Sequence, residues 1–105
     1  MDHGISKQDY LLVMKILNKY IQDDEPIWLF GSRAKGTHQK FSDVDLCVEF
    51  HDCSMGLKAE ILDEISKSDF PYFVDIVSDK DITLKFRKII DAQKVDFRSL
   101  SIKQT

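Results

Sequence analysis

The sequence has little of several residue types that mark specialised classes of protein. Two cysteines in 105 residues are too few for a disulfide framework, and they lack the Cys-x-x-Cys pairing of a zinc site or redox motif. Its uninterrupted apolar runs, such as residues 11–14, fall far short of the roughly 20 residues that span a bilayer. The N-terminus carries Asp2 where a secretion signal carries positive charge. We therefore expect a cytoplasmic protein without a membrane span.

An excess of basic charge is also missing. Fifteen Lys and Arg residues stand against 18 Asp and Glu residues, for a net charge of -3 and an isoelectric point near 5.5. This balance excludes a general nucleic-acid binder, so any phosphate must be held locally. With 43% hydrophobic residues the chain can form a core, and its length predicts a single domain over residues 1–105.

The first predicted element is a helix over residues 7–22. Ser6 and Asp9 resemble a capping box at its start. Its apolar residues form two neighbouring stripes, which are Tyr10, Val13, Met14, Leu17 and Ile21 beside Leu12, Ile16 and Tyr20. Such a wide apolar surface indicates either burial on two sides within the chain or an interface with a partner.

The rest of the chain reads as an alternation of strands and helices. A continuous apolar run predicts a strand over residues 27–30, followed by a polar loop to residue 42 with room for one helical turn. Period-two alternation predicts a half-buried strand over residues 43–50. A helix capped by Ser54 and ending near Ser68, a strand over 70–77, a helix over 79–92 and a flexible tail over 94–105 complete an α/β sheet of at least three strands.

Three aspartates stand out in the predicted strands. Asp43 and Asp45 project from one face of the second strand, and Asp75 interrupts an apolar run in the third. An unpaired buried carboxylate is costly, so Asp75 is expected to meet a cation or an open cleft. Carboxylate oxygens suit Mg²⁺, whereas the three isolated histidines do not supply a zinc site and read as solvated surface residues. Cys47 shares the aspartate face and is expected to pack as a small apolar residue.

The turn after the first strand predicts a phosphate-binding site. Gly31 permits close approach of the backbone to a ligand, and the hydroxyl and N–H groups that begin at Ser32 can hold phosphate oxygens. Arg33 and Lys35 are each either a neutralising charge for a triphosphate or a solvated loop charge.

These pieces occur with a diagnostic spacing. Gly31 and Ser32 are followed by ten residues and then by Asp43, Val44 and Asp45. This pattern resembles the active-site signature of the DNA polymerase β-like nucleotidyltransferases. The segments GSRAKG and SDVDL are similar to the GSRARG and SDIDL of the small members called minimal nucleotidyltransferases, and Val-Asp-Ile around Asp75 matches their third aspartate. The resemblance covers residues 27–77 and implies a palm-like fold, a small mixed sheet with helices mainly on one face.

The resemblance also implies an activity. It implies two Mg²⁺ ions on Asp43, Asp45 and Asp75, and ATP held by Gly31 and Ser32. Arg33 is a further candidate for binding the triphosphate. Asp75 is the candidate to take the proton of the attacking hydroxyl. Minimal nucleotidyltransferases commonly act as antitoxins that adenylylate a tyrosine of a small helical HEPN RNase toxin. The alternatives are nucleotidyl transfer to a small hydroxylated molecule such as an antibiotic, and a non-catalytic antitoxin that acts by binding alone.

Overall fold

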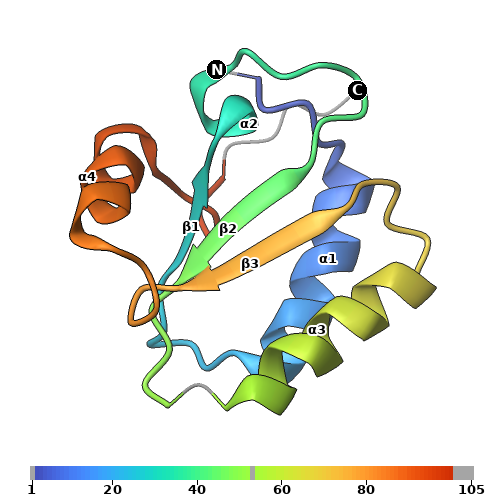
Figure 1. The fold of residues 1–105 in the computed structure, drawn as a ribbon. Helices are drawn as coiled ribbons and strands as arrows, with labels where there is room; N and C mark the ends of the chain where they lie inside the picture. Colours follow the sequence, from blue (N-terminus) through green and yellow to red (C-terminus); the bar gives the residue numbers. More distant parts are fainter. Residues whose placement is uncertain (1, 53, 101–105) are drawn as a thin grey trace.

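The computed structural model describes residues 2–52 and 54–100 (Figure 1). Within those ranges the chain order is α1 (Lys7–Tyr20), β1 (Ile27–Phe30), α2 (Ser32–Lys35), β2 (Val44–Val48), α3 (Met55–Lys67), β3 (Val74–Ser78), α4 (Leu84–Gln93) and β4 (Val95–Asp96). The expected alternation is confirmed, with α2 as the helical turn in the predicted loop. In this part of the chain no helix is long and apolar enough to cross a membrane.

The strands form one mixed sheet in the order β3-β2-β1-β4. β1 pairs antiparallel with β2 and β4, whereas β2 pairs in parallel with β3. The register places Asp45 opposite Phe30 on one side and opposite Asp75 on the other. Because strand side chains alternate between faces, Asp45 and Asp75 share one face of the sheet, while Val44 and Leu46 occupy the other.

Helices α1 and α3 cover the face that carries Val44 and Leu46 (Figure 1). Both apolar stripes of α1 are used there: Val13 and Leu17 are fully buried, and Tyr20 packs against the same core. Burial on two sides is therefore the correct alternative for this helix, and its stripes are largely covered within the chain. The helix ends at Tyr20 rather than residue 22, because Ile21 adopts an extended backbone and its N–H closes on the Leu17 carbonyl.

Helix α4 lies on the opposite side of the sheet from α1 and α3 (Figure 1). It contributes Ile90 to a second apolar cluster with Phe30 and Cys47, and Phe86 meets the Phe30 ring edge-on at 5.7 Å between centroids. Cys47 is 3% exposed, which confirms its predicted packing. The helix begins later than expected because Thr83 caps it, with its hydroxyl accepting the Phe86 N–H.

The prediction of a flexible tail from residue 94 is wrong for residues 95–100. Val95 and Asp96 form β4 against β1, and Phe97 is fully buried. The Tyr10 hydroxyl donates to the Phe97 carbonyl at 2.6 Å, and the Arg98 guanidinium donates to the Glu25 carbonyl at 3.0 Å. These contacts are non-local, so the polar sequence of this segment gives no sign of them. Residues 101–105 of the predicted tail lie outside the described residues.

A buried carboxylate joins two loops at the end of the sheet far from Gly31. Glu25 is 5% exposed, and its two oxygens accept the N–H groups of Gln22 and His51, each at 2.7 Å. The side chain thereby holds the loop before β1 to the loop after β2. Main-chain donors that lose a charged acceptor inside a protein are costly to leave unpaired.

Glu25→Ala is expected to lower the free energy of unfolding by about 1.5–3 kcal/mol, because two partly buried main-chain N–H groups lose their charged acceptor. Urea denaturation measures this loss. Asp24→Ala is the matched control, since that side chain is 72% exposed and its contact with His51 Nε2 is a surface pair, where a loss below about 1 kcal/mol is expected. Equal losses in the two variants would contradict the structural role of Glu25.

Candidate active site

Gly31 directly follows β1, and its backbone has a conformation that only glycine adopts readily. Its φ is 79° and its ψ is -160°. A Cβ built on this residue would lie 2.4 Å from Asp45 Oδ2. The missing side chain therefore lets the turn that follows β1 lie directly against a carboxylate of β2. The sequence predicted close backbone approach at Gly31, and the structure identifies the Asp45 side chain as one group that requires it.

Ser32 begins the short helix α2, as expected for the predicted turn. The Lys35 N–H donates to the Gly31 carbonyl at 3.2 Å, and the Thr37 N–H donates to the Ser32 carbonyl at 2.9 Å. Ser32 itself is half-buried, whereas Lys35 is exposed. The turn thus has a defined main-chain geometry next to Asp45.

Gln93, at the end of α4, contacts the same turn. Its Oε1 accepts the Gly31 N–H at 2.5 Å, which ties the last residue of α4 to the end of β1. Sequence reasoning missed this residue, because nothing in the local pattern of α4 indicates that its last side chain reaches a turn 62 residues earlier in the chain.

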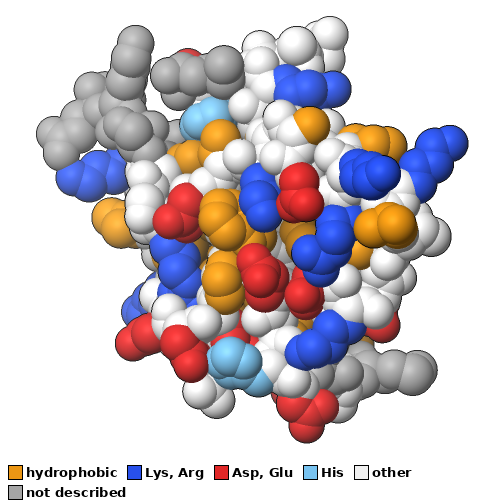
Figure 2. All heavy atoms as spheres, turned by 90° about the vertical axis from the view of Figure 1, so that its left-hand side faces the viewer, with side chains coloured by type: hydrophobic (Ala, Val, Ile, Leu, Met, Phe, Trp, Pro, Cys, Tyr) orange, Lys and Arg blue, Asp and Glu red, His pale blue; other side chains and the backbone are white. Residues whose placement is uncertain are grey.

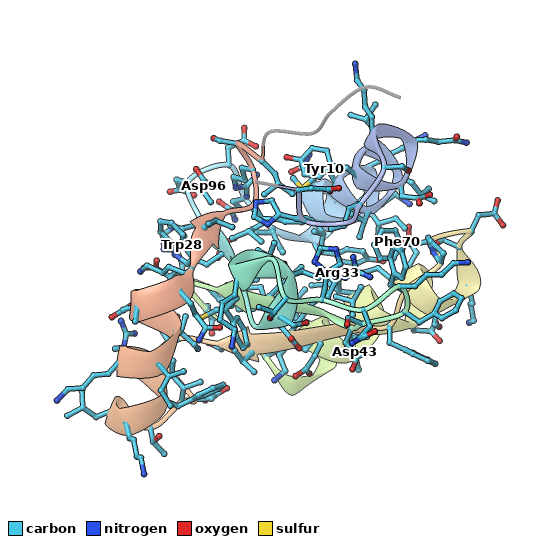
Figure 3. The ribbon with its side chains drawn as sticks, turned by 90° about the horizontal axis from the view of Figure 1, so that it is seen from above. Tyr10, Trp28, Arg33, Asp43, Phe70 and Asp96 are labelled. Carbon is cyan, nitrogen blue, oxygen red and sulfur yellow. The ribbon has the colours of Figure 1, made fainter. Side chains whose placement is uncertain are left out.

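The structure places all three predicted aspartates at one region of the sheet. Asp45 of β2 and Asp75 of β3 are register partners, and Asp43 lies one residue before β2. Asp43 and Asp75 are exposed, and Asp45 is half-buried. In Figure 3, the view from above, Asp43 lies toward the rim of the molecule while Arg33 lies further in. The acidic groups therefore combine a sheltered member with two accessible ones.

The three carboxylates influence one another. The pKa of Asp45 is raised above its ordinary value, first by burial and then by the negative charges of Asp75 and Asp43. This region therefore concentrates negative charge on neighbouring strands, and these like charges repel one another. Figure 2 shows acidic and basic side chains mixed over the α4 side of the molecule, with apolar side chains between them. No broad basic field appears on that face.

The donor set fits Mg²⁺ in chemistry. Carboxylate oxygens are hard ligands, and a divalent cation would offset the repulsion from Asp75 and Asp43 that adds to burial in raising the Asp45 pKa. Over residues 2–52 and 54–100, no three His, Cys, Asp or Glu side chains are gathered at the distances of a formed metal centre. The register brings Asp45 and Asp75 together at the level of the backbone, while a coordination geometry is not formed among the side chains.

The surroundings of the Arg33 side chain differ most from those expected. The residue is 1% exposed, so it is not a solvated loop charge. Its Nε and Nη2 donate to the Ser42 carbonyl at 3.0 and 2.9 Å, and Nη1 donates to the carbonyls of His3 and Gly4. The guanidinium also lies 4.1 Å from the centroid of the Tyr72 ring. Its donors thus point into the protein toward main-chain acceptors.

Two histidines are also less solvated than expected. His3 Nδ1 lies 2.6 Å from the Arg33 carbonyl, and His38 Nδ1 is buried without a hydrogen-bond partner among the described residues. Both belong to the contact between the N-terminal segment and the turn around α2. Sequence spacing could not reveal this contact, since the two segments are joined only in the fold.

The comparison with protein families decides the class. A family model described as polymerase beta, nucleotidyltransferase matches residues 13–99. The chain belongs to this family. The predicted resemblance and the fold class are confirmed.

Relatives of this nucleotidyltransferase share most of its length. It is 34% identical over 85 residues to the probable protein adenylyltransferase MntA of Haemophilus influenzae, a match that covers 80% of this chain and 75% of that protein. A solved toxin-antitoxin complex with AMP-PNP contains a chain of similar fold, with a TM-score of 0.70, 22% identity and coverage of 84% of this chain and 71% of that one. The structure of a tri-AMPylated Shewanella oneidensis HEPN toxin with its MNT antitoxin gives a TM-score of 0.65 at 18% identity, covering 87% and 70%.

Gly31→Ala is expected to lower the free energy of unfolding by about 1–3 kcal/mol, because alanine is strained in this backbone conformation. The new Cβ would also displace the Asp45 carboxylate, so affinity for ATP with Mg²⁺, measured by calorimetry, should fall as well. Gly56→Ala in α3 is the matched control: a Cβ there meets nothing within 4 Å, and a gain of about 0.5–1 kcal/mol is expected. Unchanged stability and affinity in Gly31→Ala would move the phosphate site away from this turn.

Proposed function

We propose that this nucleotidyltransferase transfers AMP from ATP to a tyrosine hydroxyl of a small helical HEPN-type RNase toxin and thereby acts as its antitoxin. The observation that carries the proposal is the pairing of Asp45 with Asp75 beside the Gly31–Ser32 turn, in a chain related to a protein adenylyltransferase. The solved complexes of similar fold that contain a HEPN toxin or an ATP analogue support the same choice of partner and nucleotide.

In this proposal Asp43, Asp45 and Asp75 hold Mg²⁺, with two ions expected, and Gly31 and Ser32 hold the triphosphate. Bound Mg²⁺ would supply charge neutralisation for the triphosphate and for the pyrophosphate that leaves, and would favour ionisation of the attacking hydroxyl. The protein contributes position: the turn after β1 sets the phosphates against β2, and the strand register sets the carboxylates beside them.

Asp75 is our candidate for the general base. It is exposed and lies on β3, the edge strand of the sheet, where a hydroxyl of a second molecule can approach it. The hydroxyl oxygen forms a bond to the α-phosphorus of ATP while the bond from that phosphorus to pyrophosphate breaks. The hydroxyl proton passes to the Asp75 carboxylate, which completes the balance of the step.

The surroundings of the carboxylates favour a protein acceptor. Phe41 is 74% exposed and Phe73 is 84% exposed, and the Val44 N–H donates to the Phe73 carbonyl one residue from Asp43. A groove of about 320 Å³ continues from Phe73 along Phe70, Pro71 and Tyr72 toward α3. Exposed aromatic rings beside an active site are apolar surface that a protein partner can bury.

A cytoplasmic location is part of the proposal. Cys47 is a free, buried thiol, and burial, followed by the charges of Asp79 and Glu49, raises its pKa to about 11. A protonated thiol of this kind is unreactive at neutral pH, which fits a reducing compartment. Cys53 lies outside the described residues.

The central test is transfer of label from α-labelled ATP, in the presence of Mg²⁺, to a candidate HEPN-type partner protein, followed by mass spectrometry of that protein. AMP is expected on a tyrosine with the wild type, and transfer should be lost in Asp43→Asn and Asp45→Asn, because each removes a ligand charge. Asp23→Asn, an exposed carboxylate in the loop before β1, is the matched control.

Other outcomes separate the alternatives. A partner that binds but is never modified would replace the enzyme with an antitoxin that acts by contact alone. Label that appears on a small hydroxylated molecule and not on the partner would favour the small-molecule acceptor. Undiminished transfer by Asp45→Asn would remove this carboxylate from the metal site.

Asp45→Asn is further expected to raise the thermal midpoint of the metal-free protein, because it relieves the repulsion from Asp75 and Asp43. Mg²⁺ with ATP should raise the midpoint of the wild type by binding the folded state, and should raise that of the variant much less. Calorimetric scans with and without the ligands measure both effects. An Asp45→Asn protein that is less stable than wild type, yet stabilised equally by Mg²⁺ and ATP, would contradict the assignment.

A further inference from the structure

We propose that Arg33 is a positioning residue that holds together the three segments carrying the site, and is not a ligand of the triphosphate. The inference rests on the proposed function of Asp43, Asp45 and Asp75. It arises from where the buried guanidinium points: each of its contacts is with a residue close in sequence to one of those segments or to the N-terminal segment.

The first link joins the phosphate turn to the segment of Asp43. Arg33 is the neighbour of Ser32 in α2, and its Nε and Nη2 both donate to the Ser42 carbonyl, at 3.0 and 2.9 Å. Ser42 immediately precedes Asp43. A forked donor on one carbonyl restrains direction as well as distance, so the turn and the start of β2 cannot slide past one another without loss of these bonds.

The second link reaches the segment of Asp75. The guanidinium lies 4.1 Å from the centroid of the Tyr72 ring, and Tyr72 leads directly into β3, where Asp75 is the second residue. The neighbouring Phe73 carbonyl accepts the Val44 N–H at 2.8 Å, which continues the connection from β3 back to β2. Arg33 therefore touches the approach to each strand that bears a site carboxylate.

The third link secures the arginine itself. Nη1 donates to the carbonyls of His3 and Gly4 at 3.0 and 3.1 Å, and His3 Nδ1 lies 2.6 Å from the Arg33 carbonyl. A Cβ on Gly4 would lie 2.6 Å from Nη1, so the N-terminal segment closes tightly over the guanidinium. With its three nitrogens engaged in this way and 1% of its surface exposed, the side chain is not available to a phosphate at the Gly31–Ser32 turn.

A second arginine provides a matched control. The Arg98 guanidinium also donates to main-chain carbonyls, those of Gln22 and Glu25, at 2.6 and 3.0 Å. It does so at the loop before β1, whereas the site lies after the other end of that strand. Arg98 is only half-buried, but its loss likewise removes an arginine that links main-chain carbonyls, without touching a site segment.

The experiment compares Arg33→Lys, Arg33→Met and Arg98→Met in the full chain. It measures amide hydrogen exchange at Thr37 and Ser42, affinity for Mn²⁺ with an α,β-methylene analogue of ATP, and kcat and KM for ATP in transfer to the partner. Both Arg33 variants should exchange faster at the two amides and lose about 100-fold in kcat, with KM for ATP changed by less than about 3-fold, because displaced groups impair the reaction geometry more than binding. Arg33→Lys should not retain more activity than Arg33→Met, since a single ammonium group cannot replace the several directed N–H donors of the guanidinium.

Arg98→Met should lose thermal stability while keeping the wild-type exchange at Thr37 and Ser42 and the wild-type kcat. If the Arg33 variants fail to fold, Tyr72→Leu and Tyr72→Phe replace them: the phenylalanine keeps the ring under the guanidinium and should retain more kcat than leucine, by about 2- to 30-fold.

Two results would overturn the proposal. One is a KM for ATP raised more than about tenfold in Arg33→Met and restored in Arg33→Lys, the signature of a phosphate-binding charge. The other is equal loss of kcat in Arg98→Met, which would reduce Arg33 to general stability. If the wild type transfers no AMP, the proposed function fails. The two measurements that need no transfer, which are amide hydrogen exchange and affinity for Mn²⁺ with the ATP analogue, still test whether Arg33 is a positioning residue.

Discussion

The parallel pairing of β2 with β3 is the constraint on which the site depends. It places Asp45 directly opposite Asp75, an arrangement of like charges that a sheet does not adopt for its own stability. The register is held from the other face, where Val44, Leu46 and Ile76 are buried under α1 and α3. A slip by one residue would expose these side chains, so the apolar core enforces the pairing of Asp45 with Asp75 on which the proposed chemistry rests.

The residues around this pair determine the shape of the site. Gly31 has no side chain at the place where one would collide with Asp45, and the buried Arg33 guanidinium donates to main-chain carbonyls. A cation buried among carbonyls and an aromatic ring is costly to desolvate, so its place in the core indicates a role that an apolar side chain could not fill. The shape of the site is thus set by interactions beneath it, while Asp43 and Asp75 remain open to other molecules.

Much of this arrangement follows from local patterns. Alternating apolar residues predicted β2 and the common face of Asp43 and Asp45, and the spacing from Gly31 to Asp45 indicated the family, to which the chain belongs. Local patterns failed where a side chain acts at long range. Phe97 is buried by β1 and α1 rather than by its own neighbours, and Arg33 is satisfied by Ser42 and by the N-terminal segment. A polar stretch and a basic loop residue look solvated until the fold supplies such partners.

The most direct measurement is a crystal structure of the chain with Mg²⁺ and an α,β-methylene analogue of ATP. The account predicts oxygens of Asp43, Asp45 and Asp75 at about 2.0–2.1 Å from Mg²⁺. It also predicts the triphosphate at the Gly31–Ser32 turn, with the Arg33 guanidinium still on the Ser42 carbonyl. A nucleotide bound away from this turn, a cation held by other side chains, or an Arg33 side chain swung out onto the phosphates would contradict it.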